Sequence, residues 1–103
     1  MTITPLIKIF SRPACNYCDL SKQLLDKSGL KYEEYVLGDQ CQSLGERKWE
    51  VTMDQLIEMV GKPVKTIPQI LWDDEHIGGY TDLREKLLDL KLLTFSDVNG
   101  WNL

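Results

Sequence analysis

Two cysteines, Cys15 and Cys18, are separated by two residues within the segment 11–18. An apolar, β-branched run precedes this segment, and residues with helical spacing follow it. Two thiols at this spacing, placed where a helix begins after a strand, can form a disulfide and open it again. The pair therefore predicts a redox site.

We expect the two cysteines to have unequal roles. A helix that begins near Cys15 places that sulfur beside free backbone N–H groups and at the positive end of the helix dipole. Arg12 adds a positive charge nearby. A free cysteine has a pKa of about 8.5, and such surroundings lower it by several units, which favours the thiolate. Cys18 lies one turn further along the same helix face and is expected to be more buried. The spacing thus predicts that Cys15 attacks the substrate and Cys18 resolves the intermediate.

The composition narrows the class of protein. A length of 103 residues predicts a single domain over 1–103. The net charge of −4 disfavours a nucleic-acid partner, and no apolar run approaches the length of a membrane span. The odd count of three cysteines and the absence of a secretory-type start argue against a disulfide scaffold. We therefore expect a protein of the reducing cytoplasm, with no nucleic-acid or membrane partner.

The first half of the chain predicts a β-α-β unit. Apolar spacing predicts a strand over 6–10 and a helix over 15–28. A second strand is expected over 31–37, and the intervening helix makes it parallel to the first. The segment 38–51 is polar and contains glycines, so we expect an irregular loop there with a helical turn near Trp49.

The second half predicts another helix, a hairpin and a last helix. A capping-box pattern at 52–55 begins a helix that ends at Gly61. The segment 66–72 is a turn entering a third strand, and 75–77 is a fourth strand antiparallel to it. Thr81 is expected to cap the last helix.

The order β-α-β-α-β-β-α indicates an α/β protein with a four-stranded mixed sheet flanked by helices. The cysteine pair follows the first strand and so lies outside the carboxyl ends of the strands, where ligands of open α/β sheets gather. The tail over 92–103, with Phe95 and Trp101, is expected to pack back on the domain or to fray.

Three separated motifs resemble the glutaredoxin family of the thioredoxin superfamily. They are Arg12-Pro13-Ala14-Cys15-Asn16-Tyr17-Cys18, Thr66-Ile67-Pro68 and Gly78-Gly79-Tyr80-Thr81-Asp82. They occur in the family's order, and the similarity spans about residues 7–90. Asn16 stands where the family usually has proline, a difference that should alter the redox potential. The short length and the long 38–51 segment resemble small glutaredoxins of bacteriophage type, whose compartment is the cytoplasm of the host cell.

The resemblance implies a thioredoxin-like fold and a dithiol glutaredoxin. Such a protein is a glutathione-dependent thiol–disulfide oxidoreductase, and it reduces protein disulfides and glutathione mixed disulfides. An enzyme such as ribonucleotide reductase is a candidate electron acceptor. Glutathione is the co-substrate and no tightly bound cofactor is expected. An iron–sulfur cluster bridged between two chains is known for relatives of the family; it stays open here and is not predicted.

The resemblance also implies a set of glutathione-binding residues. The backbone of Ile67, before a cis Pro68, can pair with the extended glutathione backbone like an added strand. Asp82 can receive the α-ammonium group, and the Thr81 hydroxyl with adjoining N–H groups the α-carboxylate. Arg12 can bind the glycine carboxylate at the other end. The full expected set is Arg12, Tyr17, Thr66, Ile67, Pro68, Gly79, Thr81 and Asp82, with no metal ligand among them.

Two other functions fit parts of the sequence. One is a thioredoxin-like donor recycled by a flavoprotein reductase, although Tyr17 and the motif at 78–82 argue against it. The other is a non-enzymatic zinc or iron–sulfur carrier. A zinc site would combine the cysteine pair with Cys41 and His76, but these spacings match no familiar zinc finger. Otherwise we expect Cys41 to be an incidental thiol, His76 to be a surface residue of the hairpin, and Glu34 to lie on a solvated face.

Overall fold

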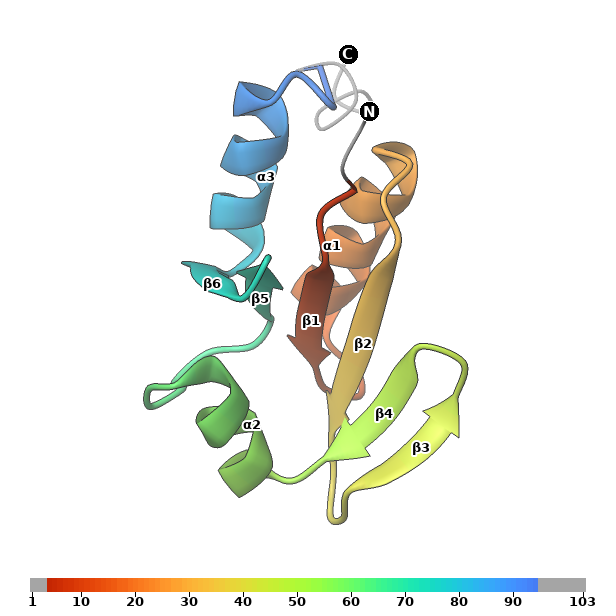
Figure 1. Cartoon of the computed structure of the whole chain (residues 1–103), viewed down its shortest axis with the longest axis vertical. Helices are drawn as coiled ribbons and strands as arrows, with labels where there is room; N and C mark the ends of the chain where they lie inside the picture. The colour runs from red at the N-terminus through yellow and green to blue at the C-terminus, as the bar shows by residue number, and fades with distance from the viewer. Residues whose placement is uncertain (1–3, 95–103) are drawn as a thin grey trace.

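The computed structural model of the chain describes residues 4–94, which form a mixed β-sheet with helices on both faces (Figure 1). The sheet has six strands in the order β3-β4-β2-β1-β5-β6. The elements are β1 (Ile7–Ser11), α1 (Asn16–Lys27), β2 (Tyr32–Leu37), β3 (Gln42–Gly45), β4 (Lys48–Val51), α2 (Met53–Val60), β5 (Gln69–Trp72), β6 (Glu75–Gly78) and α3 (Tyr80–Asp89).

The central strands pair as the sequence predicts. β1 and β2 are parallel, with Ile7 opposite Tyr32, and α1 makes the connection between them. β5 lies antiparallel to β1 on its other side, with Ile9 opposite Ile70. β6 pairs antiparallel with β5 and forms the edge of the sheet. The end of β1 is therefore near the middle of the sheet, where chain segments from both halves can reach it.

The prediction of four strands is wrong, because the segment expected as an irregular loop holds a β-hairpin. β3 and β4 pair antiparallel, and β4 joins the sheet parallel to β2 (Figure 1). Trp49 lies opposite Tyr35 in this register, and their rings stack at 5.1 Å; the Tyr35 ring in turn stacks on Phe10 at 5.3 Å. All of β3 is exposed, so its sequence carries no buried face that could have revealed a strand.

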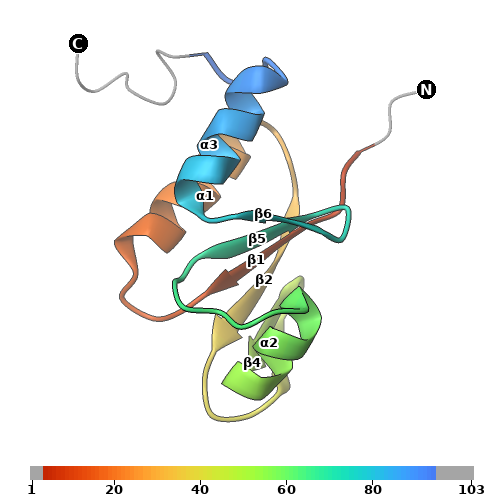
Figure 2. The ribbon, with the colours of Figure 1, turned by 90° about the vertical axis from the view of Figure 1, so that its left-hand side faces the viewer.

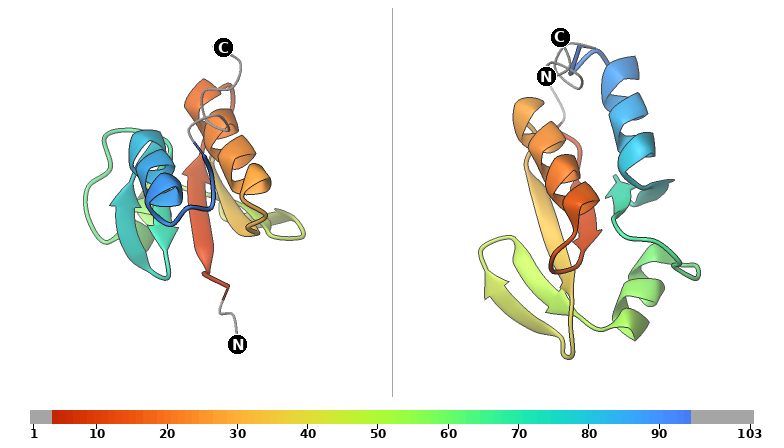
Figure 3. Two further views of the ribbon diagram at one scale, coloured as in Figure 1. Left: turned by 90° about the horizontal axis from the view of Figure 1, so that it is seen from above. Right: turned by 180° about the vertical axis from the view of Figure 1, so that it is seen from behind.

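The helices cover opposite faces of the sheet. α1 and α3 lie side by side on one face, and α2 covers the other (Figures 2 and 3). Side chains along β1 alternate between the two faces of the sheet. Ile7 and Ile9 face α1 and α3, while Phe10 faces α2. The core on the α1–α3 face consists of Ile7, Ile9, Leu24, Leu25, Ile70, Trp72, Leu83, Leu87 and Leu93. The core on the α2 face consists of Phe10, Val51, Leu56, Val60 and Leu71.

The predicted start and end of α2 are correct, whereas the predicted cap of α3 is wrong. The Thr52 hydroxyl caps α2 by accepting a hydrogen bond from the Gln55 N–H at 3.3 Å, and Gly61 ends the helix with φ 85°. Thr81 does not cap α3; the N-cap is Gly79. The reason is that α3 already begins at Tyr80, so Thr81 lies inside its first turn. The Asp82 carboxylate accepts a hydrogen bond from the Gly79 N–H at 3.0 Å. The Thr81 hydroxyl is thus left free for other partners.

The chain continues past α3 onto the core that α1 and α3 cover. Leu93, just after α3, is buried against the α1–α3 core. The expectation for Phe95 and Trp101 falls outside the described residues. Among the helices of residues 4–94, none combines the length and the apolar character needed to cross a membrane.

The α2 core gives a direct test of the fold. Leu56 is completely buried, whereas Leu44 on β3 is 45% exposed. We expect Leu56→Ala to lower the free energy of unfolding by about 2–5 kcal/mol, because it removes buried apolar surface and leaves a cavity. The matched change Leu44→Ala should alter it by less than about 0.5 kcal/mol. Urea unfolding measures both, and equal effects of the two substitutions would contradict the placement of α2 on the sheet.

Candidate active site

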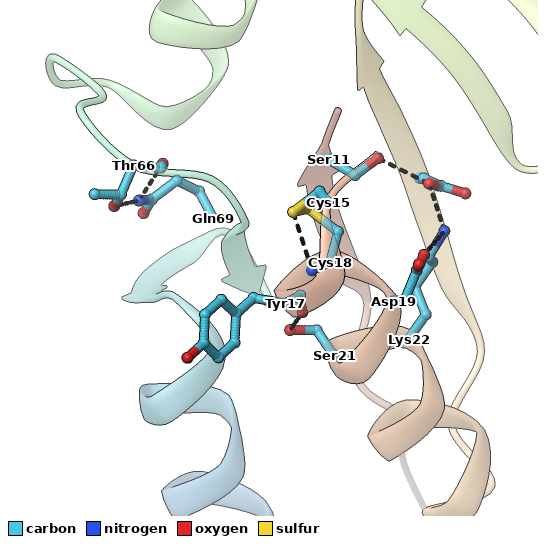
Figure 4. The surroundings of a disulfide bond; sticks show 10 residues. Ser11, Cys15, Tyr17, Cys18, Asp19, Ser21, Lys22, Thr66 and Gln69 are labelled. Atoms are coloured by element: carbon cyan, nitrogen blue, oxygen red, sulfur yellow. Dashed lines mark hydrogen bonds and ion pairs between the residues drawn. A yellow bond between two sulfur atoms is a disulfide. The ribbon is translucent and has the colours of Figure 1, made fainter. Parts of the chain in front are cut away.

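The cysteine pair lies at the start of α1 (Figure 4). Cys15 is the N-cap residue, and a disulfide joins it to Cys18 with a Cα–Cα distance of 5.2 Å. The Cys15 Sγ accepts a hydrogen bond from the Cys18 backbone N–H at 3.1 Å. This N–H is one of the donors that a helix leaves unpaired at its N-terminus. Cys18 is 1% exposed and Cys15 is 7% exposed, so the expected difference in burial is present.

The chain makes a tight turn to bring Cys15 to this position. β1 ends at Ser11, Pro13 follows in a turn, and Ala14 takes a left-handed conformation with φ 55°. The turn places the sulfur directly beyond the carboxyl end of β1, where the sequence predicts the site.

An ion pair between the buried Glu34 and the partly buried Lys22 anchors this region to β2. The Glu34 carboxylate accepts hydrogen bonds from the Ser11 hydroxyl at 2.8 Å and from the Lys22 ammonium at 3.1 Å (Figure 4). Burial alone would raise the pKa of Glu34, but the hydrogen bonds from Ser11 and Lys22 prevail and lower it. The expectation that Glu34 is solvated is therefore wrong, since it ties the end of β1 and the first half of α1 to the sheet.

The second motif forms a loop held by side-chain hydrogen bonds. The Ile67–Pro68 peptide bond is cis, which confirms what the resemblance implies. The Gln69 side-chain amide donates to the Thr66 carbonyl at 2.8 Å and to the Thr66 hydroxyl at 2.9 Å (Figure 4). The remaining Gln69 carbonyl oxygen therefore accepts from the His76 ring on β6. This hydrogen bond ties the half-buried His76 to the loop, and burial, with a further contribution from Lys62, lowers the pKa of His76.

The third motif brings the start of α3 against that loop. Gly78 has φ 116°, and a Cβ at this position would collide with the Asp82 carboxylate. A Cβ on Gly79 would lie 3.2 Å from the Pro68 carbonyl oxygen, which is tighter than an ordinary contact. The two glycines thus allow α3 to begin directly beside the cis-proline loop.

A pocket of about 450 Å³ lies between the cis-proline loop and the start of α3. Its lining is Tyr17, Thr66, Ile67, Pro68, Gly79, Tyr80, Thr81, Asp82 and Arg84. Every residue of the expected glutathione set lies here except Arg12, which lines a neighbouring pocket of about 330 Å³ together with Lys65. The two pockets share Thr66 and Ile67, so they adjoin at the cis-proline loop.

Two lining residues were not expected. Tyr80 packs on Tyr17, with ring centroids 5.5 Å apart, and its place inside the third motif could have revealed it. Arg84 follows that motif on α3 and has no feature in the sequence that distinguishes it from a solvated charge.

The zinc alternative is not supported by the geometry. Within residues 4–94, no three His, Cys, Asp or Glu side chains are grouped so that they could hold a metal ion. Cys41 is exposed beside the β3–β4 hairpin, where its sulfur lies 3.9 Å from the Thr52 hydroxyl. The four residues of the suggested zinc set are therefore not assembled.

Comparison with known proteins places this site in a family. The family model "Glutaredoxin" matches residues 7–77. Glutaredoxin 1 of Escherichia coli (strain K12) is 40% identical over 74 residues, which cover 72% of this chain and 82% of that protein. Glutaredoxin of Haemophilus influenzae is 41% identical over 76 residues, or 74% of this chain and 83% of that protein.

Solved structures agree with the sequence comparison. Glutaredoxin 1 from Francisella tularensis, complexed with cacodylate, has a TM-score of 0.62 at 28% identity and covers 85% of this chain and 98% of its own. The buckwheat glutaredoxin–glutathione complex has a TM-score of 0.60 at 32% identity and covers 85% of this chain and 73% of its own.

The fold and the cysteine pair define a thioredoxin-like thiol–disulfide oxidoreductase. With 71 consecutive residues matched by the family model, the chain belongs to the glutaredoxin family. Its activity is glutathione-dependent, with glutathione as a co-substrate rather than a tightly bound cofactor. The predicted fold class and enzyme class are confirmed.

The ion pair between Glu34 and Lys22 predicts that the stability of the fold depends on pH. The pKa of Glu34 is lower in the folded protein than its ordinary value of 4.5. Its ion pair therefore stabilises the fold fully above about pH 4.5 and loses this effect as the pH falls through the folded-state value. We expect Glu34→Gln to lower the free energy of unfolding by roughly 1–3 kcal/mol at pH 7, and by less at pH 3.

Urea unfolding at the two pH values measures this difference. Glu58→Gln on the exposed face of α2 is the matched control and should have little effect at either pH. A cost of Glu34→Gln that is the same at pH 7 and pH 3 would show that the carboxylate is not stabilised by its partners.

Proposed function

We propose that this protein is a dithiol glutaredoxin in which Cys15 attacks and Cys18 resolves, with the glutathione part of the substrate held in the pocket beside them. The observation that carries the proposal is the position of the Cys15 sulfur at the N-terminus of α1, hydrogen-bonded to the Cys18 N–H. A thiolate at this position is stabilised by the same donor and by the helix dipole.

The pocket has suitable groups for one end of glutathione. The backbone of Ile67, ahead of the cis Pro68, lies in the lining and can pair with an extended peptide. Asp82 offers a carboxylate for the α-ammonium group of the γ-glutamyl residue. Thr81, which takes no part in capping α3, can donate its hydroxyl to the α-carboxylate together with backbone N–H groups at the helix start.

The adjoining pocket suits the other end. Arg12 is exposed there beside Lys65, and both can attract the glycine carboxylate. Tyr17 is 58% exposed and lies between the cysteine pair and α3, where it can wall the groove (Figure 4). The buckwheat protein, which has this fold, is a glutaredoxin–glutathione complex, and this supports the choice of ligand.

Reduction of a mixed disulfide needs only Cys15. Its thiolate attacks the glutathionyl sulfur, the disulfide bond of the substrate breaks, and the released thiolate takes a proton from water. A second glutathione thiolate then attacks the glutathionyl sulfur held on Cys15. This step frees the Cys15 thiolate and forms oxidised glutathione. A stabilised thiolate is a good leaving group in this second step.

Reduction of a protein disulfide uses both cysteines. Cys15 attacks one substrate sulfur and displaces the other; Cys18 then attacks the Cys15 sulfur and displaces the first. The substrate gains two electrons and two protons, and the Cys15–Cys18 disulfide remains. Two glutathione molecules reduce it and leave as oxidised glutathione. An enzyme such as ribonucleotide reductase is a candidate acceptor at the level of substrate class.

We also propose that the protein works in a reducing cytoplasm. The exposed free thiol of Cys41 and the use of glutathione as reductant both support such a compartment. A fluorescent fusion that is excluded from the cytoplasm would contradict this assignment.

Serine variants of the cysteines test the roles. We expect Cys15→Ser to lose at least about a hundredfold in activity on every substrate, because a hydroxyl is not ionised at neutral pH as a thiolate is. Cys18→Ser should keep mixed-disulfide reduction within about threefold but lose reduction of a protein disulfide, which needs the resolving thiol. Glutathione-coupled assays on both substrate types measure this.

Cys41→Ser is the matched control, since it removes an exposed thiol outside the pocket, and it should change neither activity. If Cys18→Ser loses mixed-disulfide reduction while Cys15→Ser keeps it, the assignment of the two roles is reversed.

A further inference from the structure

Arg84 is a cation in the pocket that has no charged partner within the described part of the chain. It lies on α3 one turn beyond Tyr80 and lines the 450 Å³ pocket. Its Nε is buried and has no hydrogen-bond partner, and no carboxylate of residues 4–94 forms an ion pair with its guanidinium. Of the described residues that line this pocket, it alone carries a positive charge.

A buried guanidinium N–H without a partner is unusual. Buried polar groups in native proteins are nearly always hydrogen-bonded, and leaving a donor unpaired costs free energy. The guanidinium is a planar fork of donors whose geometry matches a carboxylate. Arg84 lines the pocket and has no anionic partner among residues 4–94, so an anionic group that enters the pocket can pair with its guanidinium.

The neighbouring charges show which carboxylate fits. Asp82 also lines the pocket, but residues two apart on a helix do not face each other. Asp82 and Arg84 accordingly do not pair, and the Asp82 carboxylate bonds to the Gly79 N–H instead. The pocket thus presents the Asp82 carboxylate and the Arg84 guanidinium as two separate groups. A ligand that carries both an ammonium and a carboxylate group can pair with both. In glutathione only the γ-glutamyl residue carries both an α-ammonium and an α-carboxylate group.

We propose that Arg84 is a specificity-determining residue whose guanidinium binds the α-carboxylate of the γ-glutamyl residue, while Asp82 binds the α-ammonium group. The inference rests on the proposed function, because it assigns a contact within the same glutathione site. It adds a full charge to a subsite that otherwise offers the carboxylate only a hydroxyl and backbone N–H groups. It makes recognition of the γ-glutamyl end depend on a residue outside the three motifs.

The test compares two substrates. One is the mixed disulfide of cysteine and glutathione; the other is its analogue whose γ-glutamyl residue lacks the α-carboxylate. We expect Arg84→Ala to lower kcat/KM about tenfold on the first substrate and to leave kcat/KM on the second unchanged. Arg84→Lys should lie between wild type and Arg84→Ala on the first substrate, because it keeps the charge but not the fork. Lys31→Ala, which removes an exposed cation outside the pocket, is the control and should match wild type on both.

Each other outcome overturns the inference. Unchanged kcat/KM of Arg84→Ala on the cysteine–glutathione substrate would show that the guanidinium does not bind it, even if an acidic protein substrate is reduced more slowly. An equal loss on both substrates would show a structural effect rather than recognition of the carboxylate. If the wild-type protein itself fails to reduce the mixed disulfide with glutathione, the proposed function fails as well, and this result is distinct from a selective effect of Arg84.

Discussion

The backbone N–H of Cys18 points at the Cys15 sulfur from 3.1 Å, and the arrangement of the site depends on this contact. It exists because the chain turns sharply after β1, so that α1 begins with Cys15 as its cap. The same geometry places Cys18 one turn away, close enough for a disulfide yet almost without exposure. A single helix start thus provides the attacking sulfur, its stabilising donor and its resolving partner.

The groove beside the sulfur depends on two segments that are distant from the cysteines in the sequence. Gln69 fixes Thr66 by two hydrogen bonds, and the Pro68 carbonyl oxygen lies close to Gly79 at the start of α3. Gly78 and Gly79 permit α3 to begin at that loop without a clash. Because the helix starts there, its free N–H groups and the side chains of its first turns line the same pocket. Glutathione binding therefore depends on the cis-proline loop and the start of α3 together, and not on any one motif.

Sequence reasoning succeeded where one face of an element is buried or a cap is specified. The parallel pairing of β1 and β2, the Thr52 cap and the Gly61 stop all follow from such patterns. It failed over 42–51, because β3 is fully exposed and the stacking of Trp49 appears only once β4 pairs with β2. Burial of Glu34 depends on partners from two other elements, which no local pattern reveals. The site residues beyond the motifs are likewise visible only after α3 has been placed.

The pH dependence of Cys15 alkylation tests most directly whether the start of α1 stabilises the Cys15 thiolate. In the reduced Cys18→Ser variant, the iodoacetamide reaction rates of Cys15 and Cys41 can be followed in one sample by peptide mass spectrometry. Cys41 is an exposed thiol that caps no helix, with its sulfur 3.9 Å from the Thr52 hydroxyl, and it serves as the internal reference. We predict that Cys15 reaches half its maximal alkylation rate at least one pH unit below Cys41. Coincident midpoints for the two thiols would contradict stabilisation of the Cys15 thiolate by the helix start.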